Sequence, residues 1–195
     1  MTSPERAAPG GPVVVLIGPP GAGKSAVGPL LADRLGVPFA DTDADVGAAA
    51  GKAPGDIFIE NGEEAFRELE RAAVTRVLGE QGTLRTRGGV LALGSGAVTD
   101  PGIRELLAGL RGGLGEWSPR TSTVVYLSAD FGTIARRIGL DKPRVVVPGN
   151  PRGRLRAMLD ERDAIYARLA KVTVPTDDLD PDELADQIAA EVTQP

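Results

Sequence analysis

The residues with the clearest chemistry form the segment 18–25, which reads GPPGAGKS and matches the pattern G-x-x-x-x-G-K-[ST] at every position. In such a segment the glycines let backbone N–H groups turn toward a phosphate, Lys24 reaches the β- and γ-phosphates, and the Ser25 hydroxyl ligates Mg²⁺. The segment follows a β-branched run and precedes a helical pattern, as the motif requires. It predicts a nucleoside triphosphate site, with a Gly-rich turn that binds nothing as the alternative.

A second polar group, Asp41-Thr42-Asp43-Ala44-Asp45, follows a short apolar segment around Phe39. Ligands of open α/β sheets gather at the carboxyl ends of the strands. One carboxylate of the pair Asp41 and Asp43 is therefore expected to face a metal and the other a substrate hydroxyl, as suits a kinase. The alternative is a helix N-cap, because Asp and Thr are favoured there. Asp45 is expected to be capping or on the surface.

A third group lies in the helical segment 58–70, FIENGEEAFRELE. Arg67 and Glu70 are three residues apart and can meet on one face of the helix. An arginine held by a carboxylate is a rigid fork for a substrate anion, and Phe58 and Phe66 give a pocket an apolar wall. A solvated ion pair on the helix surface is the alternative.

Three weaker features complete the chemistry. The turn Gly94-Ser95-Gly96 would present backbone N–H groups at the same sheet edge, although many such turns bind nothing. Arg162 and Tyr166 are four residues apart on a helix, so that Arg162 either points into the cleft or lies on the surface. Basic residues in or beside an irregular segment are candidates for a phosphate clamp or are simply solvated; they are Arg136, Arg137, Lys142, Arg144, Arg152, Arg154 and Arg156.

Strand-like and helical segments alternate along the chain and place these residues. Such alternation predicts a parallel sheet with helices on both faces, in a single domain over 12–195. Strands are expected at 13–17, around 39, and at 90–93, 124–127 and 172–174, with helices between them and a last helix from 181. Two segments interrupt the alternation: 111–122, read as a surface excursion, and 139–153, read as an irregular lid. Residues 1–11 are expected to be a disordered leader.

Composition limits the function. The 195 residues carry a net charge of −5, which argues against a general nucleic-acid or anionic-membrane binder. The chain has no Cys and no His, which excludes disulfides, thiol catalysis and an imidazole base. Proton transfer falls to a carboxylate, Lys, Tyr or the substrate. The sequence shows neither a signal peptide nor a membrane-length apolar run, so a cytoplasmic location is expected.

These pieces, in this order, resemble the shikimate kinase family from about residue 13 to residue 192. The phosphate-binding pattern occurs in many kinases, whereas its combination with D-T-D at 41–43, F-R-x-x-E from Phe66 and R-x-x-x-Y from Arg162 is far more specific. The resemblance implies a P-loop NTPase-type three-layer α/β/α sandwich, with five parallel strands in the order 2-3-1-4-5, a substrate-binding segment at about 43–80 and a lid. It implies a monomer that uses ATP, Mg²⁺ and shikimate.

The resemblance also implies roles for single residues. Asp41 would support Mg²⁺ with Ser25, and Asp43 would contact the hydroxyl that is phosphorylated. Arg144 would cross from the lid onto the transferred phosphate, which makes Lys24, Asp43 and Arg144 the catalytic set. The implied ATP-binding residues are Gly21, Ala22, Gly23, Lys24, Ser25, Ala26, Arg137 beside the adenine, and Arg144. The implied substrate-binding residues are Asp43, Phe58, Phe66, Arg67 and Arg162 on the carboxylate, Glu70 beside them, and Gly94, Ser95 and Gly96.

Several positions depart from the family pattern. Ser95 replaces the middle glycine of a Gly-Gly-Gly turn, and a positive φ there would be strained. Residues 145–147 are Val-Val-Val instead of Pro-Leu-Leu, and the loop at 175–180 is more acidic than usual. Two other functions stay open: a kinase for another small polyol acid such as gluconate, and a nucleotide-binding protein that has lost turnover. Paired arginines favour a carboxylate substrate, and the retained catalytic set disfavours lost turnover.

Overall fold

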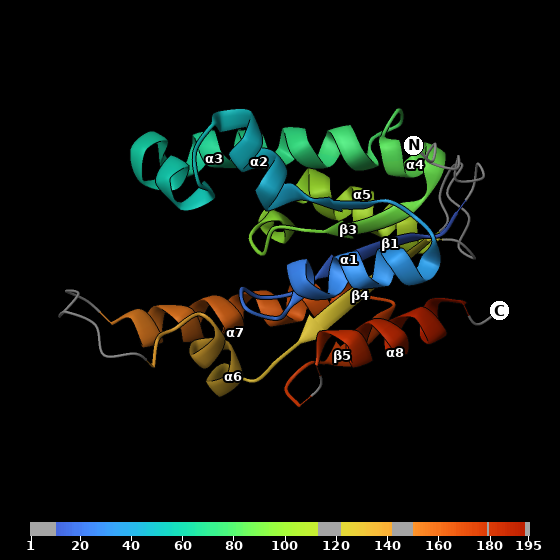
Figure 1. Cartoon of the computed structure of the whole chain (residues 1–195). Helices are drawn as coiled ribbons and strands as arrows, with labels where there is room; N and C mark the ends of the chain where they lie inside the picture. The colour runs from blue at the N-terminus through green and yellow to red at the C-terminus, as the bar shows by residue number, and fades with distance from the viewer. Residues whose placement is uncertain (1–10, 113–121, 142–149, 179, 194–195) are drawn as a thin grey trace, which may run out of the picture.

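The computed structural model describes residues 11–112, 122–141, 150–178 and 180–193 (Figure 1). Arg144, residues 1–10 of the expected leader, and residues 113–121 and 142–149 of the two irregular segments lie outside the described residues. Among the described helices, none is both long and apolar enough to cross a membrane.

A parallel sheet forms the centre of the described chain. Its strands are β1 (Val13–Ile17), β2 (Phe39–Asp41), β3 (Gly89–Ala92), β4 (Ser122–Ser128) and β5 (Val172–Pro175). They pair in the order β2-β3-β1-β4-β5, and each of the four pairings is parallel. The expected strand order is therefore confirmed. Since β1 lies in the middle, the segment that follows it opens at the centre of the carboxyl edge.

Helices cover both faces of this sheet (Figure 1). The helices are α1 (Lys24–Leu35), α2 (Thr42–Ala50), α3 (Pro54–Leu78), α4 (Thr83–Arg87), α5 (Pro101–Gly112), α6 (Phe131–Arg137), α7 (Pro151–Leu169) and α8 (Pro181–Thr193), with a short 3₁₀ turn η1 (Ala97–Thr99). Helices α1 and α8 pack on one face, whereas α3, α5 and α7 contribute to the core on the other. The expected three-layer arrangement is confirmed.

The β1 run VVVLI explains why the two cores meet at this strand. Its side chains alternate between the faces: Val13, Val15 and Ile17 join the core with α3, α5 and α7, and Val14 and Leu16 join the core with α1 and α8. Each such side chain contributes about 1.5–3 kcal/mol when it is fully buried. A strand that is apolar on both faces must be covered on both, and the central place of β1 in the strand order then sets the position of the phosphate-binding segment.

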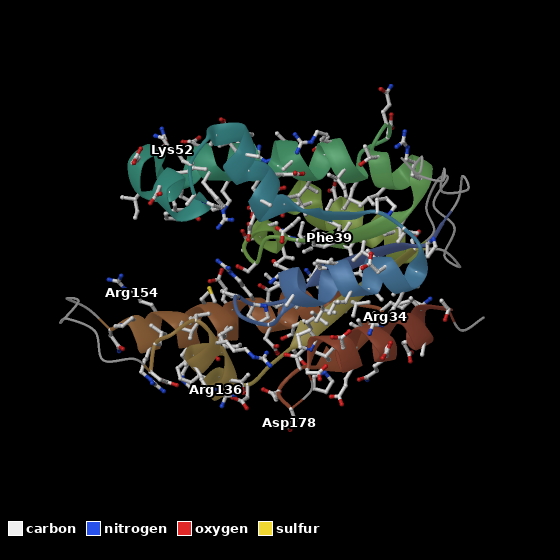
Figure 2. All side chains as sticks on the ribbon, viewed as in Figure 1. Arg34, Phe39, Lys52, Arg136, Arg154 and Asp178 are labelled. Carbon is white, nitrogen blue, oxygen red and sulfur yellow. The ribbon has the colours of Figure 1, made fainter. Side chains whose placement is uncertain are left out.

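Ion pairs connect α1 and α8, the two helices that pack on the same face of the sheet. Arg34, which Figure 2 labels, lies in the last turn of α1 and forms ion pairs with Asp182, at 3.0 Å, and with Asp186, both on α8. These pairs are partly exposed, so each adds little to stability. They nevertheless connect α8 to α1, which is the helix that starts at the phosphate-binding loop.

Two expectations about irregular segments are wrong at their margins. Helix α7 begins at Pro151 and not after residue 153, because Asn150 caps it through a 2.8 Å hydrogen bond from the Gly153 N–H and proline is compatible with the first helical turn. Helix α5 extends to Gly112 and β4 begins at Ser122, so the excursion between them is shorter than predicted.

Candidate active site

The loop between β1 and α1 has the backbone of an anion site. Gly18, Gly21 and Gly23 adopt φ values of 144°, 76° and 98°, which L-residues with a side chain rarely reach. Helix α1 then begins at Lys24, and among the described residues no side chain caps its first N–H groups. The glycine-rich loop therefore leads into a helix N-terminus, whose positive dipole end suits phosphate binding.

Lys24 closes over this loop. Its Nζ donates hydrogen bonds to the carbonyl oxygens of Gly18, at 2.7 Å, and Pro19, at 2.9 Å. Desolvation lowers the pKa of Lys24 to about 8, although the charges of Asp43 and Asp41 act in the opposite direction. A bound phosphate would give this ammonium a negatively charged partner in place of neutral carbonyl oxygens.

Asp41 serves two neighbours at once. Its Oδ2 accepts a 2.6 Å hydrogen bond from the Ser25 hydroxyl, and its Oδ1 accepts from the N–H groups of Asp43, at 2.9 Å, and Ala44, at 3.4 Å. Asp41 is therefore the N-cap of α2 through its Oδ1, so the alternative prediction of a helix N-cap is confirmed for this residue. The other oxygen forms a hydroxyl–carboxylate pair with Ser25. Asp45 lies on the surface side and pairs with Arg76 at 2.8 Å.

A cavity of about 260 Å³ lies beside this loop. It is built from α2, both halves of α3, the turn after β3, and α7, which are distant in sequence. The residues that line it are Asp43, Pro54, Gly55, Phe58, Phe66, Arg67, Glu70, Ser95, Gly96 and Arg162. All the predicted substrate-binding residues except Gly94 line it directly; we call it the acid cavity.

Helix α3 supplies the fork of this cavity. Arg67 Nη1 contacts Glu70 Oε2 at 2.6 Å, and Nη2 contacts Glu63 at 3.4 Å. Glu70 is only 1% exposed, so this is not the solvated pair of the alternative reading. The Phe66 ring lies 5.5 Å from the guanidinium and meets Phe58 edge to face at 5.9 Å. The expected apolar wall and the expected fork are therefore adjacent.

A kink separates the two halves of α3. Gly62 has φ 84° and ψ 170°, so the helical hydrogen bonding is interrupted there. The kink lies between Phe58 and Phe66, which are too far apart along a straight helix to meet as they do. The local break therefore shapes the wall of the acid cavity.

The turn after β3 fits closely between these charged groups. A Cβ on Gly94 would lie 2.6 Å from a Glu70 oxygen and 2.7 Å from an Asp43 oxygen, and a Cβ on Gly96 would lie 2.3 Å from Arg67 Nη1. Gly94 thus packs closely against Glu70 and Asp43 but does not itself line the cavity. Ser95, between them, needs no positive φ, since no described residue other than glycine has one. The expected strain at Ser95 is absent.

Helix α7 closes the far side of the acid cavity. Arg162 Nη1 lies 3.3 Å from the Ser95 carbonyl oxygen, and the buried Nε of Arg162 has no hydrogen-bond partner in the part of the chain that the structure describes. Within that part no carboxylate pairs with Arg162 either. Arg162 interacts electrostatically with Glu70 but, unlike Arg67, has no carboxylate in direct contact in that part of the chain, so an anion in the cavity would be stabilised.

The two carboxylates of the cavity titrate unusually. Burial raises the pKa of Asp43, and the nearby Asp41 adds to this, while Lys24 and Arg67 oppose it. Burial also raises the pKa of Glu70 against the opposing effect of Arg67. Asp43 lines the acid cavity and interacts electrostatically with Lys24, so the loop and the cavity belong to one site.

Arg137 lies on the other side of the loop. Its Nη1 donates to the Gly21 carbonyl, at 3.3 Å, and to the Thr176 hydroxyl, at 3.0 Å. Arg137 thus links the phosphate-binding loop to the segment after β5, and its place beside the adenine stays a prediction. Ala22 is buried inside the loop, and Ala26 is exposed in the first turn of α1.

Sequence reasoning overlooked several residues of this site. Thr42 is fully buried, and its Oγ1 accepts a 2.8 Å hydrogen bond from the Gly94 N–H, which joins the Asp41–Asp43 segment to the turn. Glu63 is a second partner of Arg67, and Gly55 lines the cavity. The position of Thr42 between two singled-out aspartates was a usable signal, whereas nothing in the sequence marked Gly55.

The fold and the site together define a P-loop kinase that acts on a small acid. The family model of shikimate kinase matches residues 20–193. A shikimate kinase of Thermobifida fusca (strain YX) is 48% identical over 93% of this chain and 95% of its own length. A shikimate kinase of Salinispora arenicola (strain CNS-205) is 46% identical over 92% and 96%. The chain belongs to the shikimate kinase family and is an ATP-dependent kinase.

Solved structures agree with this assignment. Shikimate kinase from Acinetobacter baumannii in complex with shikimate is 31% identical, with a TM-score of 0.75, over 93% of this chain and 92% of that one. A gluconokinase from Sinorhizobium meliloti 1021 reaches a TM-score of 0.58 at 19% identity, over 95% and 93%. The second similarity reflects the fold alone.

Proposed function

We propose that this chain transfers the γ-phosphoryl group of ATP to the 3-hydroxyl of shikimate, giving shikimate 3-phosphate and ADP. The observation that carries the proposal is the charge pattern of the acid cavity. Arg162 is a guanidinium without a carboxylate in direct contact among the described residues, and it lines the same cavity as a second arginine, Arg67, and Asp43. This pattern fits a small molecule with a carboxylate at one end and an alcohol at the other.

In this arrangement the residues mainly position and neutralise charge. The bond between the γ-phosphorus and the bridging oxygen of ATP breaks as the substrate oxygen bonds to phosphorus, and such transfers need little help from a strong base. Asp43 accepts a hydrogen bond from the attacking hydroxyl, orients it, and takes up its proton late, as the new P–O bond forms. Lys24 stabilises the negative charge on the β- and γ-phosphates. A chain without histidine can therefore catalyse this reaction.

Mg²⁺ fits the donors at the loop. The Ser25 hydroxyl and the Asp41 carboxylate are hard oxygen donors in mutual contact at 2.6 Å. Mg²⁺ is commonly held by one or two protein oxygens together with phosphates and water, so the absence of a cluster of three or more acidic ligands in the described residues is consistent with it. When bound, the ion neutralises phosphate charge; Ser25 and Asp41 are the residues that would hold it. Arg144 remains a prediction as the lid arginine.

A coupled ADP-release assay with shikimate, quinate and gluconate tests the proposal. We expect turnover with shikimate, and we expect Asp43→Asn to reduce kcat by about 10²- to 10⁴-fold, the range for a group that handles the reacting proton. Asp45→Asn is the matched control, because Asp45 is in the same segment but pairs with Arg76 on the surface. Turnover with another acid alone would assign a different substrate, and ATP binding without any turnover would contradict the proposal.

A further inference from the structure

One carbonyl oxygen beneath the acid cavity accepts hydrogen bonds from two side chains of α7. The Tyr166 hydroxyl donates to the Ser95 carbonyl at 2.6 Å, and Arg162 Nη1 donates to the same oxygen at 3.3 Å. Tyr166 is 1% exposed, so its hydroxyl bond is shielded from water. The shorter bond belongs to the tyrosine, and the arginine is held more loosely.

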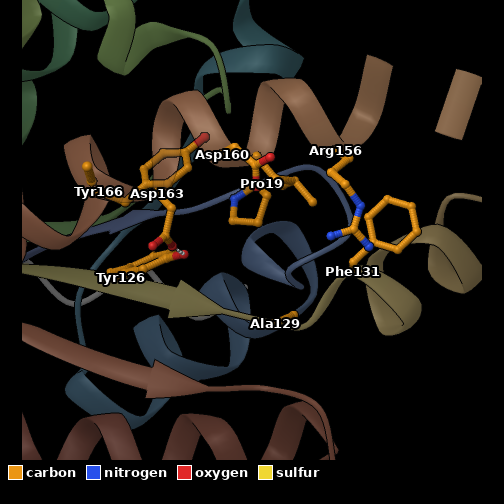
Figure 3. A pocket seen from close by; sticks show the side chains of 10 residues that line it. Pro19, Tyr126, Ala129, Phe131, Arg156, Asp160, Asp163 and Tyr166 are labelled. Atoms are coloured by element: carbon orange, nitrogen blue, oxygen red, sulfur yellow. Dashed lines mark hydrogen bonds between the residues drawn. The ribbon is translucent and has the colours of Figure 1, made fainter. Parts of the chain in front are cut away.

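The ring of Tyr166 has little freedom to move. It stacks on Tyr126 of β4, with ring centroids 5.2 Å apart and an interplanar angle of 26°. The Tyr126 hydroxyl in turn donates to Asp163 Oδ1 at 2.6 Å, as Figure 3 shows for the cavity that both tyrosines line. Burial raises the pKa of Tyr166 to about 12, so that its hydroxyl remains a donor at neutral pH.

Arg162 shares its acceptor, the Ser95 carbonyl oxygen, with Tyr166. With Tyr166 bonded to the Ser95 oxygen, the guanidinium makes only a long contact there and keeps its charge for a ligand. Without the tyrosine hydroxyl, the Ser95 oxygen would be left to Arg162, because a buried carbonyl without a donor is costly. The guanidinium would then be drawn toward the turn.

We propose that Tyr166 is a positioning residue, which holds the Ser95 carbonyl so that Arg162 remains available to the carboxylate of the acid substrate. The inference rests on the proposed function, since it assumes that the acid cavity binds that carboxylate. Tyr166 acts through Arg162 and is not assigned contact with the substrate.

The test compares Tyr166→Phe with Tyr126→Phe. Both changes remove one buried phenolic hydroxyl with a 2.6 Å hydrogen bond, and the two rings stack on each other. We expect Tyr166→Phe to raise KM for shikimate about five- to tenfold, the effect of one hydrogen bond, with kcat and KM for ATP within about twofold. Tyr126→Phe should lower Tm comparably and leave KM for shikimate unchanged. Equal KM values in the two variants would overturn the inference.

A double-mutant cycle shows whether the effect passes through Arg162. In an Arg162→Ala background, Tyr166→Phe should change KM for shikimate by no more than about twofold, because coupled residues are not additive. The same increase in both backgrounds would place the action of Tyr166 elsewhere and contradict the inference. Failure of the proposed function is recognised separately, since the unmodified protein would then show no turnover with shikimate.

Discussion

The phosphate-binding loop and the acid cavity are built in opposite ways. The loop takes its donors from the consecutive residues 18–25, and its lysine bonds to carbonyls of the same segment. The acid cavity takes its lining from α2, α3, the turn after β3, and α7. One half of the site is therefore a local structure, whereas the other exists only when four segments are packed together.

This difference indicates how a substitution should affect each half of the site. A contiguous loop keeps its shape as long as β1 and α1 hold its ends. In the cavity, charged groups of one segment also pack against another, as Glu70 and Arg67 of α3 pack against Gly94 and Gly96 of the turn after β3. Defects in the loop are therefore expected to remove turnover. Defects in the cavity other than at Asp43, which orients the reacting hydroxyl, are expected to weaken binding of the acid while turnover at saturation is retained.

The largest effect outside Asp43 is expected at the loop. Lys24→Ala removes the ammonium that is placed over the phosphates and should reduce kcat by about 10²- to 10³-fold or more. Steady-state assays of ADP release at saturating shikimate measure this effect. Lys52→Ala, at an exposed lysine that pairs with Glu60 on the surface, is the control and should retain kcat. Retention of kcat in Lys24→Ala would break the distinction between the two halves.

The next effect is expected in the cavity. Arg67→Ala removes one guanidinium and leaves the buried Glu70 without its partner, so KM for shikimate should rise about 10- to 100-fold, while kcat changes far less. The matched control is Arg71→Ala, one turn later on α3, where the side chain is 52% exposed and pairs with Asp100. Unchanged kinetics in Arg67→Ala would show that the acid binds elsewhere.

A smaller effect should follow from filling the space beneath Arg67. In Gly96→Ala the new Cβ meets only the flexible end of Arg67, and the φ of Gly96, −88°, suits alanine. The guanidinium must therefore move, and KM for shikimate should rise by about three- to tenfold with little change in Tm. Gly109→Ala, in α5 with open space around it, should leave KM unaltered and raise stability by about 0.5–1 kcal/mol. A fall in Tm without a change in KM would mean that Gly96 is only structural.

The smallest effect is a pH dependence at the loop. Because the pKa of Lys24 is lowered to about 8 in the folded chain, the empty site loses its ammonium charge as pH rises through that value. The value of kcat/KM for ATP should therefore fall above about pH 8, since this ratio reports ionisations of the free enzyme. The folded pKa lies below the unfolded one, so this group makes the free energy of unfolding rise between about pH 8 and 10.5. A pH-independent kcat/KM for ATP up to pH 10 would contradict the assignment.

The sequence by itself determined a parallel sheet covered on both faces and the phosphate-binding loop. The β1 run is apolar on both faces and must be covered on both, and the G-x-x-x-x-G-K-[ST] pattern encodes the conformation of the loop within eight consecutive residues. The pairing of Arg67 with Glu70 was also accessible, because the spacing is local to one helix.

Only the tertiary structure decided how the other half of the site is assembled. The Thr42 bond to Gly94 and the use of one Ser95 oxygen by Arg162 and Tyr166 follow from contacts between residues 52 to 71 positions apart. Such contacts depend on how helices pack on the sheet, and packing is a property of surfaces that meet in space. Local residue spacing carries no information about them, which is why the acid cavity was predicted as a set of residues and not as a geometry.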